Sequence, residues 1–284
     1  MSLPPILDNK RHDAPSVFEP VALVREARRQ KSLAITDVPG LCVLDPDGDI
    51  LRRLKQMGAA TRMETWPCYH TDLYSFPLAG RICGIVACAV GAPFAVLVAE
   101  ELFACGCEFL MSVTSAGQIT AAGTPPYFVI IDRALRDEGT SYHYAAPETF
   151  ARADPKLIGT AKTALDEAAI RAHVGSSWTT DAPFRETAEA IEAARAKGVF
   201  AVEMEAAALY TFAKKRNAAV LCLAQVTNTM GLAGQDFEKG EAGSGACAAG
   251  PGSAREQFAV TSYDFRLWHK ADIPRVSSDV RFWG

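Results

Sequence analysis

The sequence predicts an α/β protein in which a central β-sheet is sandwiched by helices. From residue 41 to residue 226, short runs rich in β-branched and aromatic residues alternate with segments that have apolar residues at helical spacing. This alternation is typical of a sheet covered by helices. The chain has 284 residues, of which 49% are hydrophobic. That is enough to bury a large core in one domain, although length alone would also allow two.

Taken in order, the first predicted elements lead into an acidic turn. Residues 16–30 have the pattern of a polar-faced helix with valines on one side. A short buried strand over 41–44 ends in a turn over 45–49, which contains three aspartates. A helix follows over 50–58, because leucine and methionine recur there every three residues.

The next units repeat the order of strand and helix. A strand over 82–87 leads to small residues and a proline at 91–93, which open a helix through Phe103. Small residues at a helix start let a ligand approach backbone N–H groups, although the pattern also fits a plain tight turn. The remaining strands are predicted over 109–113, 128–131, 173–177, 199–202 and 219–226, and Asp154-Pro155 caps a further helix.

Charge and hydropathy exclude several classes of partner. The net charge of −4 argues against a broad surface for nucleic acid or anionic membranes. No clean apolar stretch reaches the roughly 20 residues of a membrane helix, because glycines and a proline break the long apolar runs. The N-terminus lacks the basic and apolar blocks of a signal peptide. We therefore expect a cytoplasmic protein with no nucleic-acid or membrane partner.

Cysteine and histidine usage gives no sign of a metal site. The eight cysteines form no CxxC pair and lie mostly in apolar runs, which indicates buried free thiols. The five histidines fall into no ligand motif. The sequence predicts neither a metal nor a cofactor.

The stretch that carries chemistry is the junction between a strand and a helix at Glu203-Met204-Glu205. On a helix that starts here, Glu205 would share a face with Leu209 and Phe212. A carboxylate among apolar side chains must find hydrogen-bond donors, and a ribose 2′,3′-diol offers two. The alternative is an ordinary first-turn acid that the helix dipole stabilises and whose head lies in water.

The run Val202-Glu203-Met204-Glu205-Ala206-Ala207-Ala208 resembles the signature of the nucleoside phosphorylase superfamily, in its uridine phosphorylase and hexameric purine nucleoside phosphorylase branch. The resemblance implies a single-domain, three-layer α/β/α fold with a mixed sheet. It places the catalytic domain in residues 1–240, with residues 1–15 a candidate disordered segment, and leaves an atypical Gly-rich segment and tail over 241–284. It also implies homo-oligomers built from dimers that share active sites, hexamers among them.

The resemblance assigns the sugar and base sides of a nucleoside site. Met204 and Glu205 would hold the ribose, with Glu203 beside them. For the base, Phe184 is the candidate stacking ring and Trp178 the second choice. The base edge would meet Arg185 and Asn228, and Asn228 would act with Glu205 in catalysis. On its own, Asn228 also fits an asparagine that ends a strand and caps its turn.

The phosphate side departs from the family. Gly48, Tyr69 and Met111 stand where the family has three phosphate-binding arginines, and Tyr69 corresponds to the one lent by a neighbouring subunit. Thr114 matches a family threonine. The nucleophile-side candidates are Thr114, Ser115, Asp45 and Tyr69, with Arg62 or Arg81 as displaced arginines. The acidic residues Asp45, Asp47 and Asp49 would repel phosphate unless they turn away.

The implied activity is cleavage of the N-glycosidic bond of a nucleoside by a pentosyltransferase, with inorganic phosphate as nucleophile and co-substrate. A second reading is a nucleosidase, in which Glu19 or Asp45 activates water. A third is a non-catalytic protein that binds nucleosides.

Overall fold

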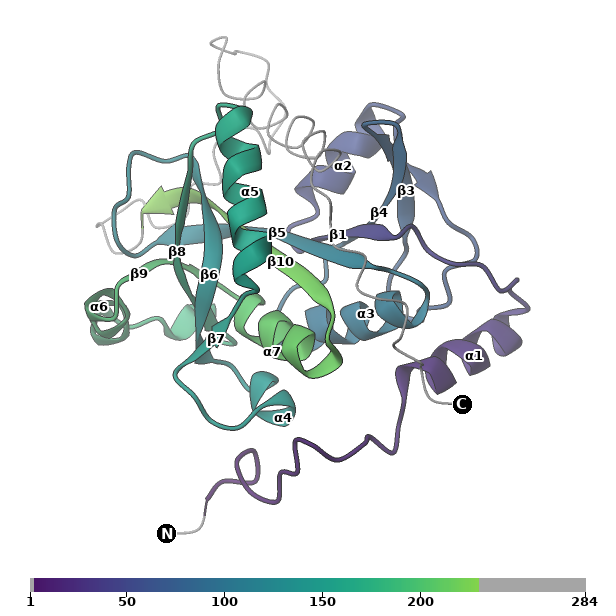
Figure 1. The fold of residues 1–284 in the computed structure, drawn as a ribbon, viewed down its shortest axis with the longest axis horizontal. Helices are drawn as coiled ribbons and strands as arrows, with labels where there is room; N and C mark the ends of the chain where they lie inside the picture. The colour runs from purple at the N-terminus through teal and green to yellow at the C-terminus, as the bar shows by residue number, and fades with distance from the viewer. Residues whose placement is uncertain (1–2, 230–284) are drawn as a thin grey trace.

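The computed structural model describes residues 3–229 (Figure 1). The Gly-rich segment and tail predicted over 241–284 lie outside the described residues. In chain order the elements are α1 (Pro20–Lys31), β1 (Leu41–Asp45), α2 (Asp49–Gln56), β2 (Thr61–Arg62), β3 (Tyr74–Leu78), β4 (Arg81–Ala87), α3 (Ala92–Ala104), β5 (Phe109–Gln118), β6 (Tyr127–Asp137), α4 (Ser141–Tyr144), β7 (Phe150–Arg152), α5 (Pro155–Glu167), β8 (Ala172–Thr180), the 3-10 helix η1 (Pro183–Arg185), α6 (Ala188–Ala196), β9 (Val199–Glu203), α7 (Ala206–Arg216) and β10 (Ala219–Thr229).

The sheet is mixed, as predicted. Its strands follow the order β10-β6-β8-β9-β5-β1-β4-β3-β2, with β7 on β6. Strand β1 is parallel to both β4 and β5, whereas β3 is antiparallel to β4 and β9 to β5. Strand β5 also pairs with β10 in parallel, so β5, β10, β6, β8 and β9 close into a ring. No pattern in the sequence predicted this closure.

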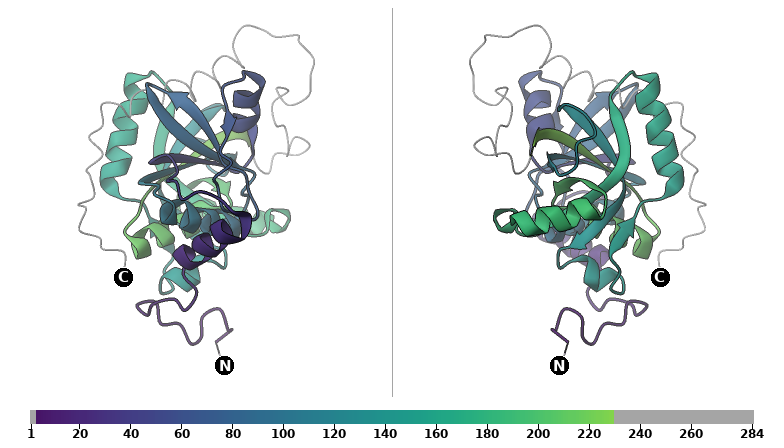
Figure 2. Two further views of the ribbon diagram at one scale, coloured as in Figure 1. Left: turned by 90° about the vertical axis from the view of Figure 1, so that its right-hand side faces the viewer. Right: turned by 90° about the vertical axis from the view of Figure 1, so that its left-hand side faces the viewer.

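Along β1, side chains alternate between the two larger of the three cores, one on each face of the sheet. On β1, Cys42 and Leu44 pack into the cluster that contains Ala95, Leu102 and Leu209, from α3 and α7. The intervening Val43 packs into the cluster that α2 and α5 cover. Figure 1 shows α1, α3 and α7 following one another along one side of the sheet, and the turned views of Figure 2 show the sheet between the two helical layers. The three-layer prediction is confirmed.

Most predicted elements are present, but several strands are longer than expected. Strands β5, β6 and β8 continue through their polar second halves to Gln118, Asp137 and Thr180. The helix predicted from residue 16 begins only at Pro20. Asp154 caps α5 as predicted, because its side chain accepts a hydrogen bond from the Lys156 N–H at 2.8 Å. No helix in the described part of the chain is long and apolar enough to cross a bilayer.

The topology predicts a crevice at the carboxyl ends of β1 and β5, and we use this word for the region around these strand ends. These two strands are parallel neighbours. The chain leaves β1 towards β4 on one side and leaves β5 towards β10 and β6 on the other. In open α/β sheets such a switch point is where ligands bind. Here β1 and β4 belong to the open part of the sheet, whereas β5 also belongs to the closed ring. The loops after β1, β4 and β5 are therefore the places to look for a site.

Candidate active site

Glu205 lies at the centre of the candidate site. It is the N-cap residue of α7 rather than part of the helix face, and it is only 1% exposed. Its Oε1 accepts a hydrogen bond from the Gly91 N–H at 2.8 Å, at the start of α3. Its Oε2 is buried and has no hydrogen-bond partner among the described residues. A buried carboxylate oxygen without a donor is costly, so a ligand hydroxyl would be a favourable partner.

The surroundings raise the pKa of Glu205 to about 8. Burial is the largest cause, and the charge of the adjacent Glu203 is the next. The Gly91 N–H and the nearby Thr114 hydroxyl lower this pKa, whereas the charge of Asp47 raises it further. Burial raises the pKa of Glu203 as well, so the two adjacent carboxyl groups titrate as a coupled pair that holds a proton at neutral pH.

Both carboxylate oxygens of Glu203 accept hydrogen bonds from other groups of the protein. Its Oε1 accepts hydrogen bonds from the hydroxyls of Ser177 at 2.9 Å and Thr179 at 2.5 Å. Its Oε2 accepts from the N–H groups of Glu205 and Ala206, each at 2.7 Å. The carboxylate thus satisfies the first N–H groups of α7 and ties β8 to the helix start. Its contacts fix the backbone of Glu205 at the start of α7.

Three more of the predicted residues lie close to Glu205. Met204 is partly buried in the junction between Glu203 and Glu205. Thr114 is 7% exposed on β5, and its hydroxyl influences the pKa of Glu205. Ser115 follows it and is bound by Asp47: Oδ2 of Asp47 accepts the Ser115 N–H at 2.6 Å, and Oδ1 accepts the Ser115 hydroxyl at 2.8 Å.

The acidic turn after β1 is held by Asp45. This side chain is 1% exposed, and it accepts hydrogen bonds from the Gly48 N–H at 3.1 Å and the Leu51 N–H at 2.9 Å. Burial raises the pKa of Asp45 to about 7, and the charges of Asp47 and Asp49 add to the shift. Asp45 therefore organises the turn and the start of α2.

Two residues beside this turn were not singled out from the sequence. Arg52 on α2 forms an ion pair with Asp49 and lies near Gly48. Cys88, after β4, packs its sulfur against Gly48 and is the exposed one of the seven free cysteines in residues 3–229. The helical i,i+3 spacing of Asp49 and Arg52 was a usable signal for this arginine. Cys88 gave none, because its approach to Gly48 depends on the pairing of β4 with β1.

The predicted base-side residues lie in different environments. Phe184 and Arg185 are on η1; both are exposed, and Phe184 is 98% exposed. Trp178 is 4% exposed in the core next to α6, and its Nε1–H donates to Asp137 Oδ2 at 2.9 Å. The backbone of Asn228 pairs with Gly117, but its side chain lies outside the described residues. Phe184 is therefore better exposed than Trp178 for stacking on a base.

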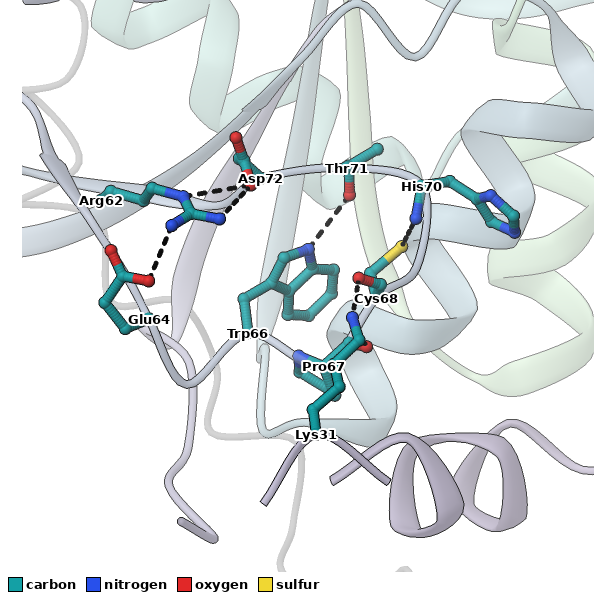
Figure 3. Close-up of polar contacts among 9 residues, drawn as sticks. All are labelled: Lys31, Arg62, Glu64, Trp66, Pro67, Cys68, His70, Thr71 and Asp72. Carbon is teal, nitrogen blue, oxygen red and sulfur yellow. Dashed lines mark hydrogen bonds and ion pairs between the residues drawn. The ribbon is translucent and has the colours of Figure 1, made fainter. Parts of the chain in front are cut away.

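Tyr69 lines a separate cavity of about 480 Å³ between the end of α1 and the segment before β3. Figure 3 shows other residues of this region, among them Lys31, Trp66 and His70. The Tyr69 hydroxyl donates to Gln30 Oε1 at 2.7 Å, and the Lys31 ammonium lies 4.5 Å from the Tyr69 ring centroid. Among the described lining residues, Tyr69 and Arg62 are the ones that the sequence suggested for the nucleophile side. The assignment of Tyr69 to an adjacent subunit's site stays a prediction.

The two displaced arginines are engaged elsewhere. Arg62 lines the Tyr69 cavity and forms ion pairs with Asp72 at 2.9 Å and Glu64 at 2.7 Å (Figure 3). Arg81 starts β4 opposite Leu78, at the amino end of the strand, away from the crevice. Neither joins the cluster of Glu205, Thr114 and Ser115.

Comparisons with known proteins identify the family of the chain. A family model described as the phosphorylase superfamily matches residues 41–248. The guanosine phosphorylase of Halorubrum lacusprofundi is 29% identical over 136 residues, which cover 46% of this chain and 55% of that protein. The uridine phosphorylase of Thermococcus kodakarensis is 28% identical over 187 residues, which cover 58% of this chain and 65% of that protein. The chain thus spans less than two thirds of the length of these curated relatives.

Solved structures give the same fold. The uridine phosphorylase of Vibrio fischeri ES114 superimposes with a TM-score of 0.61 at 21% identity, over 68% of this chain and 82% of that one. The structure of its complex with 6-hydroxy-1-naphthoic acid gives a TM-score of 0.63 at 18% identity, over 82% of this chain and 93% of that one. At these identities the likeness shows the fold alone.

Proposed function

Because this chain belongs to the phosphorylase superfamily, we propose that it cleaves the N-glycosidic bond of a nucleoside. The observation that carries the proposal is the buried Oε2 of Glu205, which has no partner among the described residues. A ribose hydroxyl would supply the missing donor. The guanosine and uridine phosphorylases among the relatives support a nucleoside as the substrate class.

The chemistry requires that the sugar carbon C1′ become positively charged as the base leaves. A carboxylate bonded to a ribose hydroxyl strengthens its hold as this charge develops, and Glu205 suits that role. Binding would also lower the pKa of Glu205 and so release its proton, since a hydroxyl that donates to the carboxylate favours the ionised form. Phe184 would stack on the base, while Arg185 and Asn228 would meet its edge.

Two nucleophiles are candidates. Phosphate is the first, because the relatives are phosphorylases by name; Thr114, Ser115 and Arg52 are the groups near the crevice that would bind it. Water is the second. The observation in its favour is that the side chains placed at the end of β1 are carboxylates, those of Asp45 and Asp47.

We extend the proposal to the assembly, a cytoplasmic homo-oligomer built from dimers. Tyr69 would then lie near the nucleophile side of an adjacent subunit. The chemistry needs no cofactor, since inorganic phosphate or water completes it.

The test is release of free base from a panel of purine and pyrimidine nucleosides, with and without inorganic phosphate. Chromatography of the sugar product separates ribose 1-phosphate from free ribose. We expect base release by the wild type and its near-complete loss in Glu205→Gln, which removes the carboxylate at nearly constant shape. Stabilisation of the fold by nucleosides without base release under any condition would instead favour a non-catalytic binding protein.

A further inference from the structure

We propose, building on the function proposed above, that Asp47 decides which nucleophile the site admits: it excludes phosphate and leaves the site to water. The proposal starts from the place of this side chain. Asp47 lies in the turn after β1 and binds Ser115 on β5, so it bridges the carboxyl ends of two neighbouring parallel strands.

The contact between Asp47 and Ser115 occupies the hydrogen-bond donors that a bound anion would need. A backbone N–H and a neighbouring hydroxyl at the end of a strand are a suitable pair for two phosphate oxygens. Here the two carboxylate oxygens of Asp47 take both donors of Ser115, at 2.6 Å from the N–H and 2.8 Å from the hydroxyl. The protein thus supplies its own anion where an external one would bind.

The charge around this position acts in the same direction. Asp49 lies at the end of the turn and Asp45 at its base, where burial raises the pKa of Asp45 to about 7. Among the described residues Arg52 is a nearby cation, and its ion pair with Asp49 already offsets its charge. A phosphate dianion would therefore meet the negative charge of Asp47 with no excess of positive charge among these described groups, whereas water carries no charge to be repelled.

The reaction that remains is hydrolysis. The water oxygen forms a bond to C1′ as the C1′–N bond breaks, and the electron pair of that bond leaves on the base nitrogen. One water proton ends on the base, and the products are free ribose and free base. No further reactant is needed.

The deciding experiment compares the wild type with Asp47→Asn in the full chain. The asparagine keeps the shape and removes the charge. We expect the wild type to release ribose at a rate that phosphate leaves unchanged. In Asp47→Asn, inorganic phosphate should bind about tenfold more tightly or better, as expected for removing one like charge next to a bound anion, and ribose 1-phosphate should appear.

Two further variants separate this role from net charge and from misfolding. Asp49→Asn removes the same charge from the same turn and also frees Arg52, yet it leaves Ser115 bound to Asp47, so it should gain less phosphate affinity than Asp47→Asn. Ser115→Ala keeps the charge of Asp47 and should gain none. An equal gain in Asp49→Asn overturns the proposal. The proposal is also overturned if the wild type forms ribose 1-phosphate in proportion to the phosphate concentration. This measurement does not require Asp47→Asn to fold.

The outcome for Asp47 is separable from the outcome for the proposed function. If no protein releases base, the proposed function fails, while calorimetric titration with inorganic phosphate still tests Asp47. Unchanged phosphate affinity in Asp47→Asn then overturns the assignment by itself. If base is released but the phosphate dependence is the same in both proteins, only the role of Asp47 fails.

Discussion

Glu205 shows at the scale of one residue how the burial that prepares a site also makes it sensitive to pH. Its pKa of about 8 lies well above the value of 4.5 for an unperturbed glutamate. The folded state therefore holds the proton more tightly than the unfolded chain does. The stability that this gives is fully present below pH 4.5 and is lost as the pH rises through about 8.

We predict that Glu205→Gln removes this dependence. The wild type should lose on the order of 3–5 kcal/mol relative to the variant between pH 5 and pH 9, at about 1.4 kcal/mol for each pKa unit. Urea unfolding across this range measures the difference. Burial also raises the pKa of Asp45, to about 7. Because Asp45 is present in both proteins, its contribution to the pH dependence of stability largely cancels in the comparison. Parallel stability curves for the two proteins would contradict the burial-driven shift.

Residues whose role depends on local sequence could be predicted, and residues whose role depends on long-range contacts could not. The Glu-Met-Glu junction was found from its position between a strand and a helix, and the structure buries Glu205 there. The hydrogen bond from the Gly91 N–H to Glu205 joins residues 114 positions apart, and that from the Ser115 hydroxyl to Asp47 joins residues 68 apart. No sequence pattern encodes such pairs, because they arise only when β1, β4 and β5 pair.

At the scale of an element, the start of α7 depends on Glu203. Four donors from β8 and from the first residues of the helix converge on this carboxylate. The sequence suggested a ribose contact for Glu203, whereas the contacts indicate a cap. The difference matters because a cap affects stability before it affects binding.

We predict that Glu203→Ala destabilises the fold by about 3 kcal/mol or more, since it leaves several buried donors without an acceptor. Equilibrium unfolding in urea measures this. The matched control is Glu189→Ala, which removes an exposed glutamate from the first turn of α6 and should cost much less. If both variants are equally stable, Glu203 is no cap, and its role as a sugar ligand regains support.

The helices were predictable because their apolar spacing and caps are local signals, as for Asp154 and α5. The ends of the long strands were not. Residues 114–118 of β5 are small and polar and resemble a turn, yet they form strand because β10 and β9 flank them. Tertiary pairing decides such segments.

At the scale of the whole molecule, the layers followed from the sequence and the closure of the sheet did not. Alternating strands and helices predict two helical layers around a sheet, and the two larger cores confirm them. The ring of five strands depends on β10 pairing with both β5 and β6, which is a property of strand order rather than of any segment. The same order sets the crevice in which Glu205, Thr114 and Asp47 meet.

The central claim is that this crevice binds the sugar of a nucleoside through Glu205, and calorimetric titration tests it most directly. Uridine and guanosine, with their 2′-deoxy counterparts, would be titrated into the wild type and Glu205→Gln. The account predicts that the wild type binds a ribonucleoside and that Glu205→Gln binds it about 10- to 100-fold more weakly, as expected for losing a hydrogen bond to a charged group. Equal affinity in the two proteins, or no binding of any nucleoside to the wild type, would contradict it.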